Sequence, residues 1–76
     1  MKSQKELVFD FANLMGGKID SNQLRNLGHN NFIADPNKRA RELVKDGKLS
    51  RRWVTDDEKH MHGYHKDVVV YEVVNG

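Results

Sequence analysis

The sequence lacks the cysteines that stabilise many small proteins through disulfides or metal sites, and it has little proline. It contains no cysteine and one proline among its 76 residues. Neither a disulfide nor a thiolate metal site can therefore stabilise the fold, which suits a reducing cytosol. No segment approaches the roughly 20 apolar residues of a membrane span, and the N-terminal residues lack the apolar run of a signal peptide. We therefore expect a soluble intracellular domain, located in the cytoplasm.

Sequence patterns of catalysis are missing as well. We find no arrangement of nucleophile and base, no glycine-rich loop that would hold phosphate, and no zinc-protease motif. The pair Gly16-Gly17 follows an apolar helical stripe and indicates the end of a helix. A domain of this size also leaves little room for a buried pocket. We expect no enzymatic activity and no cofactor.

The length allows a single domain covering residues 1–76. Hydrophobic residues make up 37% of the chain, which is low for a globular protein, and charged residues make up 32%, which is high. The core must therefore be small. Folding remains plausible because the apolar residues recur at regular spacings.

Positive charge is concentrated in the middle of the chain. Residues 36–54 carry seven basic and two acidic side chains, a local net charge of +5, whereas the whole chain carries +2. Residues 1–35 are neutral overall, and residues 55–76 carry −3. Most charged helix faces are merely solvated, but so uneven a balance in one contiguous stretch favours contact with nucleic acid.

Three helices are predicted. The first spans about 4–15, after a capping-box pattern of Ser3 and Glu6. Its apolar stripe consists of Leu7, Val8, Phe11, Leu14 and Met15. After a short extended link at 18–20, a second, short helix begins at Asp20 or Ser21 and ends at Gly28.

The third helix begins at Asp35-Pro36, where aspartate caps the helix and proline takes its first position. We expect a turn at 29–31 before it, with Phe32 and Ile33 entering the core. Its own buried stripe is Ala40, Leu43 and Val44, and Gly47 ends it.

Two strands complete the chain. Residues 49–54 alternate in polarity, and residues 68–74 are rich in β-branched side chains. They predict an antiparallel hairpin whose long polar tip covers 55–67. Trp53 could stack on a base, but its alternating neighbours favour a core or hairpin aromatic.

This order of elements resembles a winged helix-turn-helix domain from about Ser3 to Val74. The resemblance is carried by the strand and helix at 19–27, by the terminal hairpin with its Val-Tyr-Glu-Val sequence, and by the R-x-R-E-L-x-x-x-G-x-L run at 39–49. That run is similar to small stand-alone winged-helix regulators of phages, mobile elements and bacteria. The resemblance implies an α+β fold with three helices, a short strand after the first helix, and a C-terminal two-stranded antiparallel wing.

The resemblance also implies sequence-specific binding of double-stranded DNA, with the third helix in the major groove and the wing on the flanking backbone or minor groove. The expected role is a transcriptional regulator, plausibly a homodimer on a palindromic operator. Carried onto this chain, the nucleic-acid-binding candidates are Asn37, Lys38, Arg39, Arg41, Lys45, Arg51, Arg52, Gln23 and Arg25.

Helical and strand geometry divide these candidates. At 100° per residue, Lys38, Arg41 and Lys45 share a solvent face, whereas Arg39 lies on the other flank, near Asp46. Arg51 and Arg52 are adjacent in a strand and point to opposite faces, so only one of them is expected to contact the same duplex.

The predicted wing begins with Asp56-Asp57-Glu58, whereas many wings have basic tips. Phosphate would repel these acids, so they either point away from DNA or bind a protein partner. An alternative function follows: a winged-helix interaction module, such as an adaptor or an inhibitor of host machinery, acting through the acidic tip or the valine-rich hairpin. A weaker alternative is RNA or single-strand binding, with Trp53, Tyr64 and Tyr71 as stacking residues.

Three histidines, His60, His62 and His65, lie in the predicted tip. If the tip were a strand, His60 and His62 would share one face, and a turn could bring His65 near, as a zinc, copper or nickel site requires. The histidines could also add positive charge on acidification. We prefer three solvent-exposed polar residues and predict no metal site.

Overall fold

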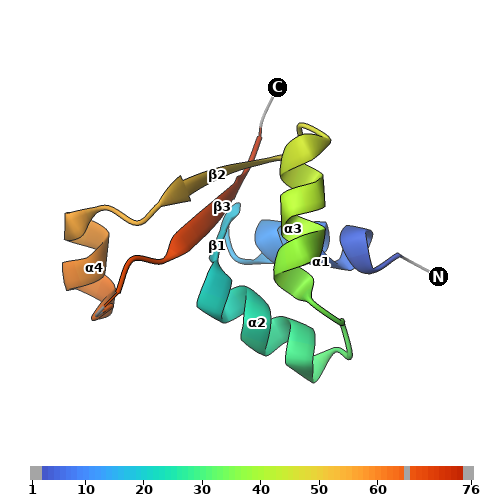
Figure 1. Cartoon of the computed structure of the whole chain (residues 1–76), viewed down its shortest axis with the longest axis horizontal. Coiled ribbons are helices and arrows are strands. Elements are labelled where there is room, and N and C mark those ends of the chain that lie inside the picture. Colours follow the sequence, from blue (N-terminus) through green and yellow to red (C-terminus); the bar gives the residue numbers. More distant parts are fainter. Residues whose placement is uncertain (1–2, 65, 75–76) are drawn as a thin grey trace.

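A computed structural model describes residues 3–64 and 66–74 of the chain. Within these ranges the chain is an α+β fold of four helices and one three-stranded antiparallel sheet (Figure 1). The elements in order are α1 (Gln4–Leu14), β1 (Lys18–Asp20), α2 (Ser21–Asn30), α3 (Pro36–Lys45), β2 (Leu49–Trp53), α4 (Asp56–His62) and β3 (Val69–Val73).

The sheet has three strands because β1 joins the predicted hairpin. Its strand order is β1-β3-β2, so β3 pairs on both sides, with Tyr71 opposite Ile19 of β1 and Arg51 of β2. The predicted two-stranded wing is therefore part of a larger sheet, which the short strand expected after the first helix completes. The short link at 18–20 is a strand since pairing with β3 supplies its backbone groups with hydrogen-bond partners.

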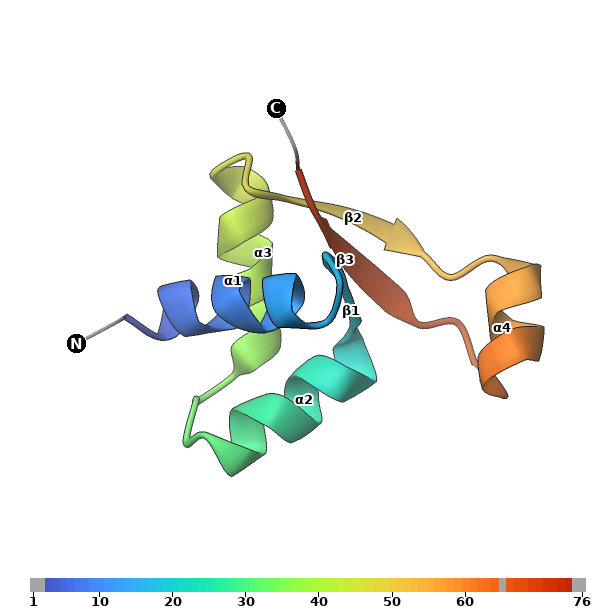
Figure 2. The same ribbon diagram turned by 180° about the vertical axis from the view of Figure 1, so that it is seen from behind.

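Helices α1, α2 and α3 pack on the sheet face that carries Ile19, Leu49 and Tyr71. Figure 2 shows α1 crossing α3, with α2 beside them. The buried core consists of Val8, Ala12, Ile19, Leu24, Ile33, Ala40, Leu43, Leu49 and Tyr71. The opposite sheet face carries a second, smaller cluster of Val54, Val68 and Val70, with Tyr64 packed against it.

The predicted stripe of α1 is shifted in the structure. Val8 and Ala12 are fully buried, one turn apart, and Leu7 and Phe11 are partly buried. Leu14 is 81% exposed, so its place in the stripe was wrong. The helix ends at this residue, beyond the part of α1 that the core covers.

Gly28 does not end α2, contrary to the prediction, because the helix continues to Asn30. The glycine is buried, and a Cβ built on it would lie 2.5 Å from Cγ of Pro36. Gly28 thus allows α2 to approach the first residue of α3 closely. Gly28 therefore serves the packing of α2 against α3, and it can do so from a position inside the helix.

The connector between α2 and α3 places one of its two apolar residues in the core. Ile33 is buried, whereas Phe32 is 94% exposed, so the prediction was wrong for Phe32. Phe32 has a φ of 57° and Asp35 a φ of 48°, both in the left-handed region. The chain reverses direction through these residues, and Ile33 rather than Phe32 meets the helices.

The hairpin tip (54–64 and 66–68 in the described ranges) contains a helix, α4, where a polar loop was predicted. Thr55 and Glu58 form a capping box: the Thr55 hydroxyl accepts from the Glu58 amide, and the Glu58 carboxylate accepts from the Thr55 amide. Gly63, with a φ of 69°, ends the helix. Figures 1 and 2 show α4 at the far end of the hairpin, away from α1, α2 and α3.

Candidate nucleic-acid interface

Helix α3 presents three basic side chains on one solvent face. Lys38, Arg41 and Lys45 are exposed, while Pro36, Ala40 and Leu43 fill the core side of the same helix. None of the three basic side chains forms a hydrogen bond or ion pair with another residue in the described ranges. Asn37, next to this face, is half-buried. The three charges are therefore available to an outside partner.

Arg39 is engaged within its own helix. Its Nη1 lies 2.7 Å from Oε1 of Glu42, one turn along, and its Nε is buried with no hydrogen-bond partner in the described part of the chain. Asp46, expected on the same flank of the helix, accepts instead from Nζ of Lys5 at 2.7 Å. That ammonium lowers the pKa of Asp46.

Arg51 and Arg52 differ in what surrounds them. Arg51 lies opposite Tyr71 in the register, is exposed and has no ion-pair partner among the described residues. Arg52 points to the other face, where Nη1 and Nη2 donate to the two carboxylate oxygens of Glu58 at 2.6 and 2.9 Å. Its Nε also donates to Glu72. Of the two arginines, Arg51 alone retains an uncompensated charge.

Glu58 is a structural residue of the hairpin tip. Besides Arg52, it accepts from the Thr55 amide at 2.9 Å and from Nζ of Lys18 at 3.3 Å. The Arg52 guanidinium, followed by the Thr55 amide, holds the pKa of Glu58 well below its usual range. One of the three acids in the predicted acidic tip is thus neutralised. Asp56 and Asp57 remain exposed at the start of α4.

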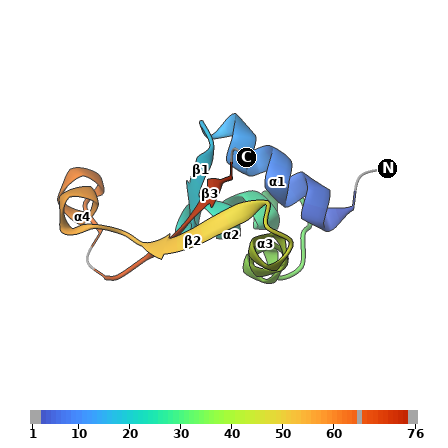
Figure 3. The ribbon, with the colours of Figure 1, turned by 90° about the horizontal axis from the view of Figure 1, so that it is seen from above.

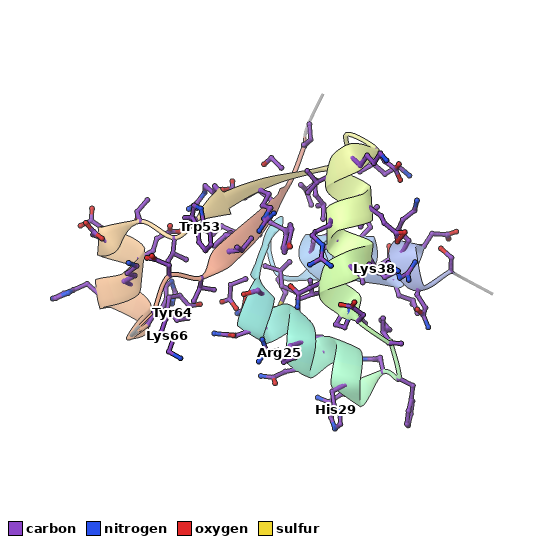
Figure 4. All side chains as sticks on the ribbon, in the orientation of Figure 1. Arg25, His29, Lys38, Trp53, Tyr64 and Lys66 are labelled. Atoms are coloured by element: carbon purple, nitrogen blue, oxygen red, sulfur yellow. The ribbon has the colours of Figure 1, made fainter. Side chains whose placement is uncertain are left out.

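Helix α2 contributes one free arginine. Arg25 is exposed, without a partner in the described ranges, and His29 follows one turn later (Figure 4). Gln23 is already used at the helix start, because its side-chain oxygen accepts from the Asp20 amide at 3.2 Å. Arg25 is the more available of the two predicted contacts on α2.

Asp20 connects α2 to the hairpin tip. It is 6% exposed, and its Oδ1 accepts from the Gln23 amide at 2.8 Å. The Tyr64 hydroxyl donates to its other oxygen, Oδ2. Burial and the interaction with Asp20 raise the pKa of Tyr64 to about 12. Tyr64 therefore serves to anchor the tip, which removes its hydroxyl from any outside ligand.

The aromatic residues of the two hairpin strands differ in their exposure to solvent. Tyr71 is 2% exposed and belongs to the core, whereas Trp53 is 61% exposed. Of the two places expected for Trp53, the core and the hairpin, it takes the hairpin. The core side of its sheet face is filled by Ile19, Leu49 and Tyr71, and Trp53 lies beyond them toward the tip.

The histidines do not lie as a strand would place them. His60 and His62 are in helix α4, where a spacing of two residues puts side chains on roughly opposite sides. The His62 ring centroid is 5.7 Å from that of Tyr64. His65 lies outside the described residues. Within the described ranges, no three histidine or acidic side chains are grouped so that they could hold a metal ion.

The comparisons with known proteins find no matching family, no matching curated protein and no matching solved structure. No helix in the described part of the chain has the length and apolar character needed to cross a membrane.

Proposed function

We propose that this chain is a winged helix-turn-helix protein that binds double-stranded DNA and acts as a small transcriptional regulator. In this proposal α2, the connector and α3 form the helix-turn-helix, and the β2–β3 hairpin forms the wing. Helix α3 enters the major groove, where arginine can read guanine and lysine neutralises phosphate.

The observation that carries the proposal is the distribution of unpaired positive charge. Lys5, Lys18 and Lys59, which belong to other elements than α3, each donate to a carboxylate. On α3, by contrast, Lys38, Arg41 and Lys45 have no acidic partner in the described ranges. A face with three uncompensated charges attracts a polyanion most strongly.

The test is a salt series of binding titrations with a fluorescently labelled random duplex. We compare the wild type with a triple variant of α3, Lys38→Gln, Arg41→Gln and Lys45→Gln. The matched control is Lys5→Gln, Lys18→Gln and Lys59→Gln, which removes the same charge from residues that already have partners.

We expect the α3 variant to lose most duplex affinity and to reduce the slope of log affinity against log salt by up to about 3, one unit for each phosphate contact. The control should bind nearly as the wild type does. A wild type with no affinity for duplex at low salt, or equal losses in both variants, would contradict the proposal.

A second candidate function is an interaction module for another protein, supported by Asp56 and Asp57, which are exposed on α4. Such a module would act through the tip rather than through Val68 and Val70, which are 7% and 3% exposed. Absence of duplex binding at low salt would favour this candidate.

A homodimer on a palindromic site also belongs to the proposal, because one module of this size contacts few base pairs. Sedimentation of the complex with a selected duplex would give the number of protein copies bound.

A further inference from the structure

Trp53 and Arg51 form a second exposed pair on the hairpin. Arg51 lies opposite Tyr71 and Trp53 opposite Val69, so both project from the same face of the sheet. This is the face that packs on the helices through Tyr71 and Ile19. At Arg51 and Trp53 the face is no longer covered, since both side chains are exposed.

Strand β2, which carries the pair, lies on the same side of the molecule as α3. Figure 3 shows α3 and β2 along one side, with α1 and β1 on the other. The two elements contact each other, and only residues 46–48 separate them in the chain. A duplex lying on α3 would therefore run close to β2.

The chemistry of the pair is that of a nucleotide contact. An indole ring stacks on an exposed base face, which a duplex offers where a base step is partly unstacked, and a neighbouring guanidinium neutralises phosphate. The charge of Arg51 is uncompensated in the described ranges, whereas Arg52 on the other face is bound to Glu58 and Glu72. The other hairpin aromatics are committed elsewhere, Tyr71 to the core and the Tyr64 hydroxyl to Asp20.

We propose that Trp53 is a base-stacking contact of the DNA site, in which its indole inserts at a partly unstacked base step at the edge of the α3 footprint while Arg51 neutralises an adjacent phosphate. The contact comes from the strand face of the hairpin, whereas α4, which carries Asp56 and Asp57, lies at the far end of the hairpin. This inference rests on the proposed function, because it assumes that α3 holds the duplex.

The chain contains one tryptophan, so fluorescence excited selectively from tryptophan reports on Trp53 alone. We would titrate the protein with unlabelled duplex and with the matching single strand, and measure affinity separately with labelled DNA. The variants are Trp53→Leu, which keeps an apolar side chain but removes the ring, and Trp53→Phe, which keeps a smaller ring. Met61→Ala, which truncates another exposed apolar side chain of the hairpin, is the control.

We expect saturating duplex to quench the fluorescence. Trp53→Leu should weaken duplex binding, but by less than the roughly 5- to 150-fold range for one stacked base of a single strand, because unstacking a base step of the duplex offsets part of the gain. Trp53→Phe should recover part of the loss, and Met61→Ala should bind as the wild type does. Since Trp53 is 61% exposed, these variants should unfold at the wild-type temperature, which circular dichroism would check.

The outcomes separate the two proposals. Duplex binding that depends on α3 but leaves the fluorescence and the Trp53→Leu affinity unchanged would overturn the stacking contact and keep the proposed function. Quenching with tighter binding of single strands than of duplex would support the contact and overturn duplex recognition. No binding of either nucleic acid would overturn both proposals. A fluorescence shift that depends on protein concentration alone would show that a second copy covers Trp53, and would overturn the contact.

Discussion

At the scale of single residues, the structure gives local sequence signals roles that depend on distant neighbours. Gly28 followed the last apolar residue of a short amphipathic pattern, which ordinarily indicates a helix end. The buried ring of Pro36 explains the glycine instead, because it occupies the position that a side chain would need. Sequence periodicity cannot distinguish these two uses of glycine, since they differ only in what lies across the interface.

Gly28→Ala should therefore destabilise the fold. Overpacking costs about 1–3 kcal/mol, and a rigid proline ring 2.5 Å from the new Cβ places this substitution toward the upper end. The better helix propensity of alanine offsets about 1 kcal/mol. We expect a net loss of about 1–2 kcal/mol in the free energy of unfolding, measured by urea denaturation.

The control for Gly28→Ala is Asn26→Ala, at an exposed position of the same helix. It should be neutral or slightly stabilising, because only helix propensity changes. If Gly28→Ala were as stable as this control, α2 and α3 could move apart without a loss in the free energy of unfolding.

At the scale of elements, the prediction succeeded where the hydrophobic pattern and the capping residues agreed. Helix α1 begins at the predicted residue, and α3 begins at Pro36 after the Asp35 cap. Helix α4 was missed because it buries none of its residues and so has no apolar stripe. The signal that could have revealed it is the T-x-x-E pattern of Thr55 and Glu58, the same kind of sequence pattern as Ser3 and Glu6 before α1.

The attachment of α4 should depend on pH through Glu58. Its pKa is depressed in the folded protein, so its contribution to stability is complete above the unfolded-chain pKa of about 4.3. The contribution is lost as the pH falls from there toward the folded value, because the unfolded chain then binds more protons. We expect the free energy of unfolding to fall steeply below about pH 5 in the wild type and less steeply in Glu58→Gln.

Urea midpoints of both proteins between about pH 3 and pH 7 would measure the two slopes. Asp57→Asn, an exposed neighbour on the same helix, should keep the wild-type slope. If Glu58→Gln and the wild type lost stability in parallel, Glu58 would not be the linked group.

At the scale of the whole molecule, the fold divides the basic stretch at 36–54 into structural and available charges. Arg52 holds Glu58 and Glu72, and Arg39 holds Glu42. Lys38, Arg41, Lys45 and Arg51 remain without partners in the described ranges. Two arginines of the same stretch should therefore respond differently to substitution.

Arg41→Ala should weaken specific DNA binding by about 1–3 kcal/mol and leave the unfolding temperature unchanged. Arg52→Ala should lower the unfolding temperature, because it leaves two carboxylates without their donor, and should affect DNA binding mainly through that loss. Parallel thermal melts and duplex titrations would measure both effects. The distinction between structural and available arginines would be wrong if Arg41→Ala destabilised the fold or Arg52→Ala left its stability unchanged.

The sequence by itself determined α1, α3, the two hairpin strands and the face shared by Lys38, Arg41 and Lys45. These features follow from spacing along one element and from caps formed by near neighbours. The tertiary structure alone decided that β1 completes the sheet, that Trp53 is exposed, and that Arg52 is bound while Arg51 is free. The reason is that these contacts join residues that are distant in the sequence. Lys5 and Asp46 are 41 residues apart, and Arg52 and Glu72 are 20 residues apart. Hydrophobic periodicity predicts whether a side chain is buried or exposed. Which charged side chains become neighbours across such distances depends on how the helices and strands pack together.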